Sequence, residues 1–163
     1  MAAALLAALA ACAHFGGVRP VYGPVPGSLS VPLDGVPGEV IDAAARAVAA
    51  AGLRVVRIAA DEGYLETEWY DVAAKRTVNA RAPGFDHIVK LRLFADPTAG
   101  KTRLAAECVV RIGYDPSMPE RDLERMVPDS TPAHAILDSL IARLKVVFPP
   151  PKAPSDTAGP QQP

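Results

Sequence analysis

The sequence predicts a single α+β domain in which a four-stranded antiparallel sheet carries two helices on one face, in the order α-β-β-β-β-α. Two observations predict this class. Apolar residues recur at three- and four-residue spacing in two segments, 37–51 and 131–148, as they do in amphipathic helices. The four segments between them have one apolar face each, which is typical of an antiparallel sheet covered on one side.

The first helix is predicted within residues 37–51, and Gly52 marks its end. Val40, Ile41, Ala44 and Val48 form its apolar stripe. The helix is rich in alanine, which predicts a thin face that can approach a sheet closely. Residues 53–60 then form the first strand, and the Asp-Glu-Gly turn at 61–63 predicts a hairpin into the second.

The second strand is predicted over residues 64–72. Leu65, Thr67 and Trp69 alternate in it with Glu66 and Glu68. Burying two glutamates would cost several kcal/mol, so the face with Leu65 and Trp69 is predicted to point inward. Trp69 is therefore expected to pack between the sheet and the final helix.

The third and fourth strands are predicted over residues 87–96 and 102–112. In the third, apolar residues alternate with Lys90 and Arg92, which are expected on the outer face. In the fourth, Cys108 falls on the inward side and is interpreted as a small core residue. Glutamates on the second strand are expected to pair with Lys90 and Arg92 across strands, giving a solvated outer sheet face.

The last helix shows the clearest amphipathic pattern of the chain. Thr131 is predicted to cap its N-terminus and Pro132 to occupy its first position. Its apolar stripe then continues to residue 147 or 148, through Ile136, Leu137, Leu140, Ile141 and Leu144.

The remaining segments predict the organisation of the chain. Residues 1–11 are interpreted as a lipoprotein signal segment, 12–37 as a tether rich in proline and glycine, and 38–148 as the single α+β domain. Within the tether, residues 30–33 either add an edge strand or lean on the domain. Residues 149–163 hold six prolines and are expected to form a disordered tail.

The start of the chain carries the strongest signal about location. Its apolar run of eleven residues is too short to span a bilayer, which needs about 20. Leu9-Ala10-Ala11-Cys12 resembles the lipoprotein box of bacterial envelope proteins, although the first basic residue comes only at Arg19. The resemblance implies cleavage before Cys12, acylation of its thiol, and a membrane anchor. Ala13, in place of Asp, implies the periplasmic side of the outer membrane. The alternative is a disordered alanine-rich start with a chance cysteine.

Composition and motifs favour binding over catalysis. The net charge of −1 provides no basic footprint, so nucleic acid is not an expected partner. No cofactor or metal motif occurs in the sequence, so neither is predicted. An acid–base pair of Asp86 and His87 with a neighbouring glutamate is the weakest interpretation, and no catalytic residue is assigned. The expected interaction surface comprises Tyr64 and Tyr70 on the outer sheet face and Leu123 and Met126 in the loop 115–130.

The segment Gly63-Tyr-Leu-Glu-Thr-Glu-Trp69, set between a preceding helix and strand and two further strands with a terminal helix, resembles the BamC-like helix-grip domains of envelope lipoproteins. The resemblance covers residues 36–147. It implies a non-enzymatic protein-interaction module that binds an envelope protein in outer-membrane protein assembly or envelope maintenance. The alternative is a carrier that holds a lipid or another small apolar ligand in a helix-grip cleft.

Overall fold

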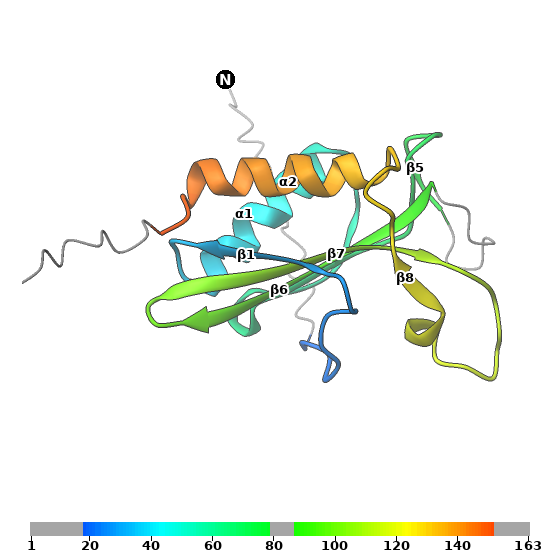
Figure 1. Cartoon of the computed structure of the whole chain (residues 1–163), viewed down its shortest axis with the longest axis horizontal. Helices are drawn as coiled ribbons and strands as arrows, with labels where there is room; N and C mark the ends of the chain where they lie inside the picture. The colour runs from blue at the N-terminus through cyan, green and yellow to red at the C-terminus, as the bar shows by residue number, and fades with distance from the viewer. Residues whose placement is uncertain (1–17, 79–86, 152–163) are drawn as a thin grey trace, which may run out of the picture.

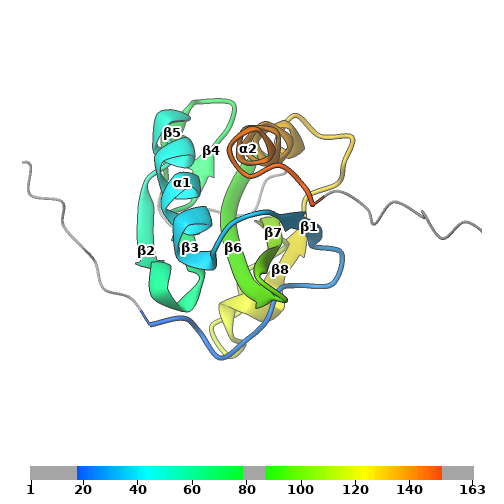
Figure 2. The same ribbon diagram turned by 90° about the vertical axis from the view of Figure 1, so that its left-hand side faces the viewer.

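The computed structural model describes residues 18–78 and 87–151. They form an α+β fold in which an antiparallel sheet carries helices α1 and α2 on the same face (Figures 1 and 2). The predicted class is thus confirmed. The predicted number of four strands is wrong, because the sheet has eight.

Two long strands form the centre of the sheet, whose main path runs β1-β7-β6-β3-β2. Strand β8 pairs with β7, while β4 pairs with both β6 and β5. In chain order the elements are β1 (Leu29–Leu33), α1 (Pro37–Ala50), β2 (Val55–Ala59), the 3-10 helix η1 (Ala60–Glu62), β3 (Tyr64–Thr67), β4 (Tyr70–Asp71), β5 (Arg76–Thr77), β6 (Ile88–Thr98), β7 (Lys101–Arg111), the 3-10 helix η2 (Glu120–Leu123), β8 (Glu124–Met126) and α2 (His134–Val147).

The fold begins upstream of residue 38, which is the predicted start of the domain. Residues 29–33, which were assigned to the tether, form strand β1 and pair antiparallel with β7. Val31 and Leu33 of this strand are buried in the core. A free tether over 12–37 is therefore the wrong interpretation for these residues, and the edge strand left open as an alternative is the correct one.

The predicted second strand is divided into β3 and β4, and this division changes the direction of its side chains. Leu65 and Tyr70 both pack in the core beneath the helices, although an uninterrupted strand would point them to opposite faces. An irregularity between Thr67 and Tyr70 supplies the extra residue, as in a β-bulge. Trp69 is consequently buried on the other face, with Ile88 and Val109, and its expected position against the final helix is wrong.

The remaining helix and strand predictions agree with the structure except at one helix end and one strand end. Helix α1 ends before Gly52, whose φ of 85° favours glycine. Most inward residues predicted for the two central strands, such as Leu91 and Cys108, lie in the core beneath the helices. Ile112, predicted as the last inward residue of the fourth strand, is exposed, because β7 ends at Arg111. Helix α2 starts at His134, later than predicted, because the Thr131 hydroxyl donates a hydrogen bond to the Pro128 carbonyl and does not cap the helix.

Candidate functional site

The four residues predicted as an interaction surface do not form one. Tyr64 is fully buried on the outer face of the sheet, with its ring 5.2 Å from that of Phe94. Tyr70 is buried in the core on the opposite face. Leu123 and Met126 are half-buried, and Met126 packs against both apolar clusters. The two tyrosines are therefore core residues and not part of a surface, whereas Leu123 and Met126 remain partly exposed.

The outer face of the sheet is covered by a strap, defined here as residues 19–26. At one end, the Arg19 backbone N–H donates to the Glu62 carboxylate at 2.7 Å and the Arg19 guanidinium pairs with Asp96 at 2.8 Å. At the other, the Val25 N–H donates to Glu107 at 2.8 Å. Figures 1 and 2 show the strap crossing beneath the sheet. The expected solvated outer face is therefore wrong at its centre, where Glu66, Arg92 and Glu107 are buried, whereas Arg103 remains exposed as predicted.

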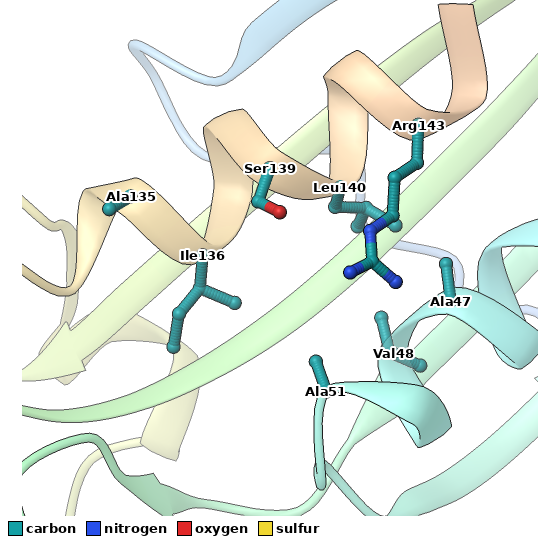
Figure 3. Close-up of a pocket in the computed structure, with 8 residues that line it drawn as sticks. All are labelled: Ala47, Val48, Ala51, Ala135, Ile136, Ser139, Leu140 and Arg143. Atoms are coloured by element: carbon teal, nitrogen blue, oxygen red, sulfur yellow. The ribbon is translucent and has the colours of Figure 1, made fainter. Parts of the chain in front are cut away.

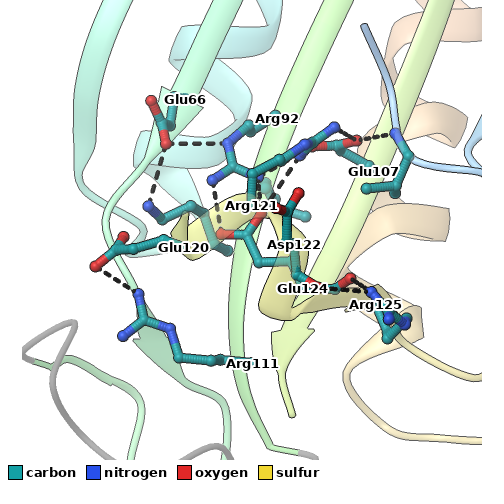
Figure 4. Close-up of polar contacts among 12 residues, drawn as sticks. Glu66, Arg92, Glu107, Arg111, Glu120, Arg121, Asp122, Glu124 and Arg125 are labelled. Atoms are coloured by element: carbon teal, nitrogen blue, oxygen red, sulfur yellow. Dashed lines mark hydrogen bonds and ion pairs between the residues drawn. The ribbon is translucent and has the colours of Figure 1, made fainter. Parts of the chain in front are cut away.

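Beneath the strap lies a buried cluster of charges (Figure 4). The Arg92 guanidinium is at its centre and donates hydrogen bonds to Glu66 at 3.0 Å, to Glu107 at 3.2 Å and to Glu124 at 2.6 and 2.9 Å. Arg121 also binds Glu107, and it donates to the Gly23 carbonyl of the strap at 2.8 Å. The predicted pairing of Glu66 with Arg92 across strands is confirmed by the strand register.

The cluster controls the ionisation of its own members. Burial alone would raise the pKa of Glu66, but attraction to Lys90 and Arg92 outweighs burial and lowers the pKa below its ordinary value of 4.5. Burial opposes the charge of Arg92 as well, and the hydrogen bonds and attraction of Glu124 reverse that effect and raise its pKa. The charged forms are thus maintained in a site shielded from water.

The lowered pKa of Glu66 predicts a stability that depends on acid. A carboxylate whose pKa is depressed by folding stabilises the native state above its unfolded pKa, and this stabilisation is lost as the pH falls. We expect the free energy of unfolding to decrease below about pH 4.5, with a smaller decrease in Glu66→Gln. Urea unfolding between neutral and acidic pH measures both slopes. Identical slopes in the two proteins would contradict the assignment.

Two hollows formed by the described residues could receive a ligand. The outer cleft, of about 540 Å³, lies between the strap and β8 and is lined by Gly23–Pro26, Arg121, Asp122 and Glu124–Met126. Its charges are already engaged: Arg121 binds Glu107, and Arg125 donates to the carbonyls of Asp122 and Glu124. A ligand would have to compete with these contacts.

The helix groove is the second hollow, of about 220 Å³, and lies between α1 and α2 on the opposite side of the sheet (Figure 3). Small side chains on both helices leave this space open, because alanine does not reach across to the facing helix. The alanines of α1 predict a surface for close packing, and the groove differs from that prediction. Its lining consists of Ala47, Val48, Ala51, Ala135, Ile136, Ser139, Leu140 and Arg143.

Arg143 gives the helix groove a charged end. Its side chain reaches from α2 toward Ala47 and Val48 of α1, whereas Ala135 and Ile136 lie at the other end (Figure 3). Residue 143 is exposed, and within residues 18–78 and 87–151 no carboxylate forms an ion pair with it. The groove therefore combines apolar walls with a guanidinium that is available to an anion.

The described histidines and Cys108 do not line the groove. His87 is 4.0 Å from Asp71, and His134 contacts Asp129 and Asp138 at the start of α2. Cys108 is buried beneath the helices, and burial raises the pKa of its thiol to about 12, which disfavours the thiolate. The predicted lipid site Cys12 and the residue Asp86 lie outside the described residues.

Across residues 18–78 and 87–151, no group of three or more His, Cys, Asp or Glu side chains is arranged to hold a metal ion. Helices in the same ranges are too short or too polar to cross a bilayer. No protein-family model matches the chain, and no curated protein matches it.

Proposed function

We propose that the protein is a lipid-anchored bacterial envelope protein that binds a partner protein through the helix groove, and that it acts by binding and not by catalysis. The observation that carries the proposal is the groove itself, which pairs apolar walls with the unengaged guanidinium of Arg143. Apolar centres bordered by arginine are characteristic of protein interfaces. The BamC-like resemblance around Trp69 supports a role in outer-membrane protein assembly or envelope maintenance.

The position of the strap limits the distance between the fold and a membrane that holds the proposed anchor at Cys12. Arg19 is fixed to Glu62 and Asp96, and it follows Cys12 by seven residues in the sequence. A chain of that length reaches at most about 25 Å, since an extended residue spans about 3.3–3.6 Å. An acylated Cys12 would hold Arg19 within that distance of the membrane. The helix groove lies on the far side of the sheet from the strap and would remain accessible to a partner.

The anchor predicts a difference between the natural chain and Cys12→Ala. Cells grown with a fatty-acid analogue should label the natural protein, and the label should be absent from Cys12→Ala, which has no thiol to acylate at the box. The natural protein should also sediment with membranes. Equal labelling of both proteins would contradict an anchor at Cys12.

Binding through the groove predicts the effect of filling it. Ser139 lines the groove and residue 139 is exposed, so Ser139→Trp should occupy the space without disturbing the core. Ala142→Trp is the matched control, because residue 142 is also an exposed position of α2 but does not line the groove. We expect Ser139→Trp to lose an envelope protein that co-purifies with both the natural chain and Ala142→Trp, at unchanged unfolding midpoints. Equal recovery by all three proteins would contradict the proposal.

The carrier alternative is less well supported by the same groove. Pockets that enclose small molecules measure about 300–1,000 Å³, whereas the groove measures about 220 Å³ and opens to solvent between two helices. This volume suits a side chain of a partner better than a whole lipid. A carrier would retain an apolar ligand in native mass spectrometry, and a binding module would not.

A further inference from the structure

The helix groove has two chemically different ends along a single stripe of α2. Ile136, Ser139, Leu140 and Arg143 recur at spacings of three and four residues and so lie on one side of the helix. Seven helical residues rise about 10 Å between the Cα atoms of Ile136 and Arg143. The Arg143 side chain reaches from there toward Val48, which brings its guanidinium closer to the apolar walls. A ligand that contacts both ends must have an apolar group and an anion within about 10 Å of each other.

We infer that the groove recognises a segment of a partner protein in which an apolar side chain stands next to a carboxylate, with the side chain between α1 and α2 and the carboxylate on Arg143. This inference rests on the proposed function and specifies the partner's chemistry. Guanidinium and carboxylate groups match in shape and charge, and can form two parallel hydrogen bonds. A partner with a basic residue at this point would be repelled by Arg143.

The walls support an apolar side chain at the other end. Three of the eight lining residues are alanines and three more are Val48, Ile136 and Leu140, so the groove offers methyl surface and only the Ser139 hydroxyl besides Arg143. Burying an aliphatic side chain there removes apolar area from water on both sides of the contact. A polar side chain would lose its hydration at the apolar end without a matching partner in the lining.

Two small probes separate the two parts of the inference. N-acetyl-leucine has an aliphatic side chain beside a carboxylate, and N-acetyl-leucinamide has the same side chain without the charge. Each is titrated into the full chain, anchored in phosphatidylcholine nanodiscs, while the amide NMR signals of Ala47, Ala51 and Ser139 are followed. We expect the carboxylate probe to bind roughly twofold to fivefold more tightly, the range measured for exposed ion pairs.

Arginine variants test where the preference arises. Arg143→Gln should abolish the difference between the probes, whereas Arg46→Gln should retain it, because Arg46 is an exposed arginine of α1 that does not line the groove. Equal affinities in the natural chain, no binding of either probe, or a preference that persists in Arg143→Gln would overturn the inference. Octanoate bound more than tenfold tighter than N-acetyl-leucine would assign the groove to a lipid and overturn it as well.

The probe titrations and the Ser139→Trp experiment can fail independently, so a failure of this inference can be told from a failure of the proposed function. Loss of the partner in Ser139→Trp together with equal probe affinities would show that the groove binds a protein without a carboxylate requirement. Retention of the partner in Ser139→Trp would instead reject the groove as the docking site, whatever the probes do.

Discussion

Replacing Arg92 by methionine is expected to lower the free energy of unfolding by about 3–5 kcal/mol, the usual cost of removing one partner from a buried ion pair. Arg92 is 3 % exposed and bonds to three carboxylates, those of Glu66, Glu107 and Glu124, which are all buried as well. Methionine fills similar space without the charge. The remaining cations, Lys90 and Arg121, would then face three buried acids. Urea denaturation at neutral pH measures the loss.

Two further variants test whether the stability lost in Arg92→Met comes from buried carboxylates left without a cation. Adding Glu124→Gln to Arg92→Met should recover part of the stability, because one uncompensated carboxylate is removed. Arg57→Met should cost at most about 1 kcal/mol, since Arg57 is 43 % exposed and lies 3.8 Å from Glu66. If Arg92→Met shifts the unfolding midpoint no more than Arg57→Met does, the cluster is hydrated and the strap does not seal the face.

Truncating Trp69 to alanine is expected to cost about 3–5 kcal/mol, as large aromatic truncations in cores do. Trp69 is 3 % exposed and packs with Ile88 and Val109 on the outer face. The Lys90 ammonium and the Arg111 guanidinium lie 5.0 and 5.2 Å from its ring centroid, at cation–π distance. The alanine variant loses both the packing and these contacts.

The companion variant Trp69→Phe separates the two contributions. Phenylalanine retains an aromatic face for the two cations but fills less volume, so its cost should lie between zero and that of alanine. Far-UV circular dichroism follows unfolding in all three proteins, because Trp69 is the sole tryptophan of the chain and cannot report on its own removal. An unfolding midpoint for Trp69→Ala equal to that of the natural chain would show that the ring is not part of the core.

The regular elements could be predicted because their patterns are local. Val89, Leu91 and Leu93 alternate without interruption along β6, and all three point into the core beneath the helices. The stripe of α2 likewise places Leu137, Leu140 and other apolar residues in the core. In these elements a period of two or 3.6 residues decides which side chains are buried.

The position of Trp69 could not be predicted because alternation holds only within an unbroken strand. The irregularity between Thr67 and Tyr70 changes the face of every residue that follows it. Thr67 takes part in this irregularity, since its hydroxyl accepts a hydrogen bond from the Leu91 N–H. No glycine or proline in the sequence of this strand marks the break.

The segment that covers the outer face of the sheet could not be predicted from the sequence either. The strand pattern correctly placed Glu66 opposite Arg92, but a pattern states which residues share a face and not what covers that face. The cover comes from residues 19–26, far away in the sequence and without periodicity. Burying glutamates without partners would be costly, but the buried Arg92 guanidinium offsets the cost for Glu66 and Glu107.

The helix groove could not be predicted either, because it depends on which residues face each other across two helices. Alanines in α1 indicate that the helix can approach a neighbour closely, but they also leave a space where the facing residue is small as well. Ala47 and Ala51 face Ala135 and Ser139 of α2 across the groove, and these two helices are separated by most of the sheet in the sequence. The hollow is therefore a property of tertiary packing.

Site-specific photocrosslinking in living cells tests the central claim, docking of a partner protein in the helix groove, most directly. A photoreactive phenylalanine analogue is placed at position 139 of the full chain or, as the control, at position 142. Position 139 should give a crosslinked product of one defined mass that is reduced by Arg143→Gln, and position 142 should not. Products of equal yield at both positions, or none at position 139, would contradict docking in the groove.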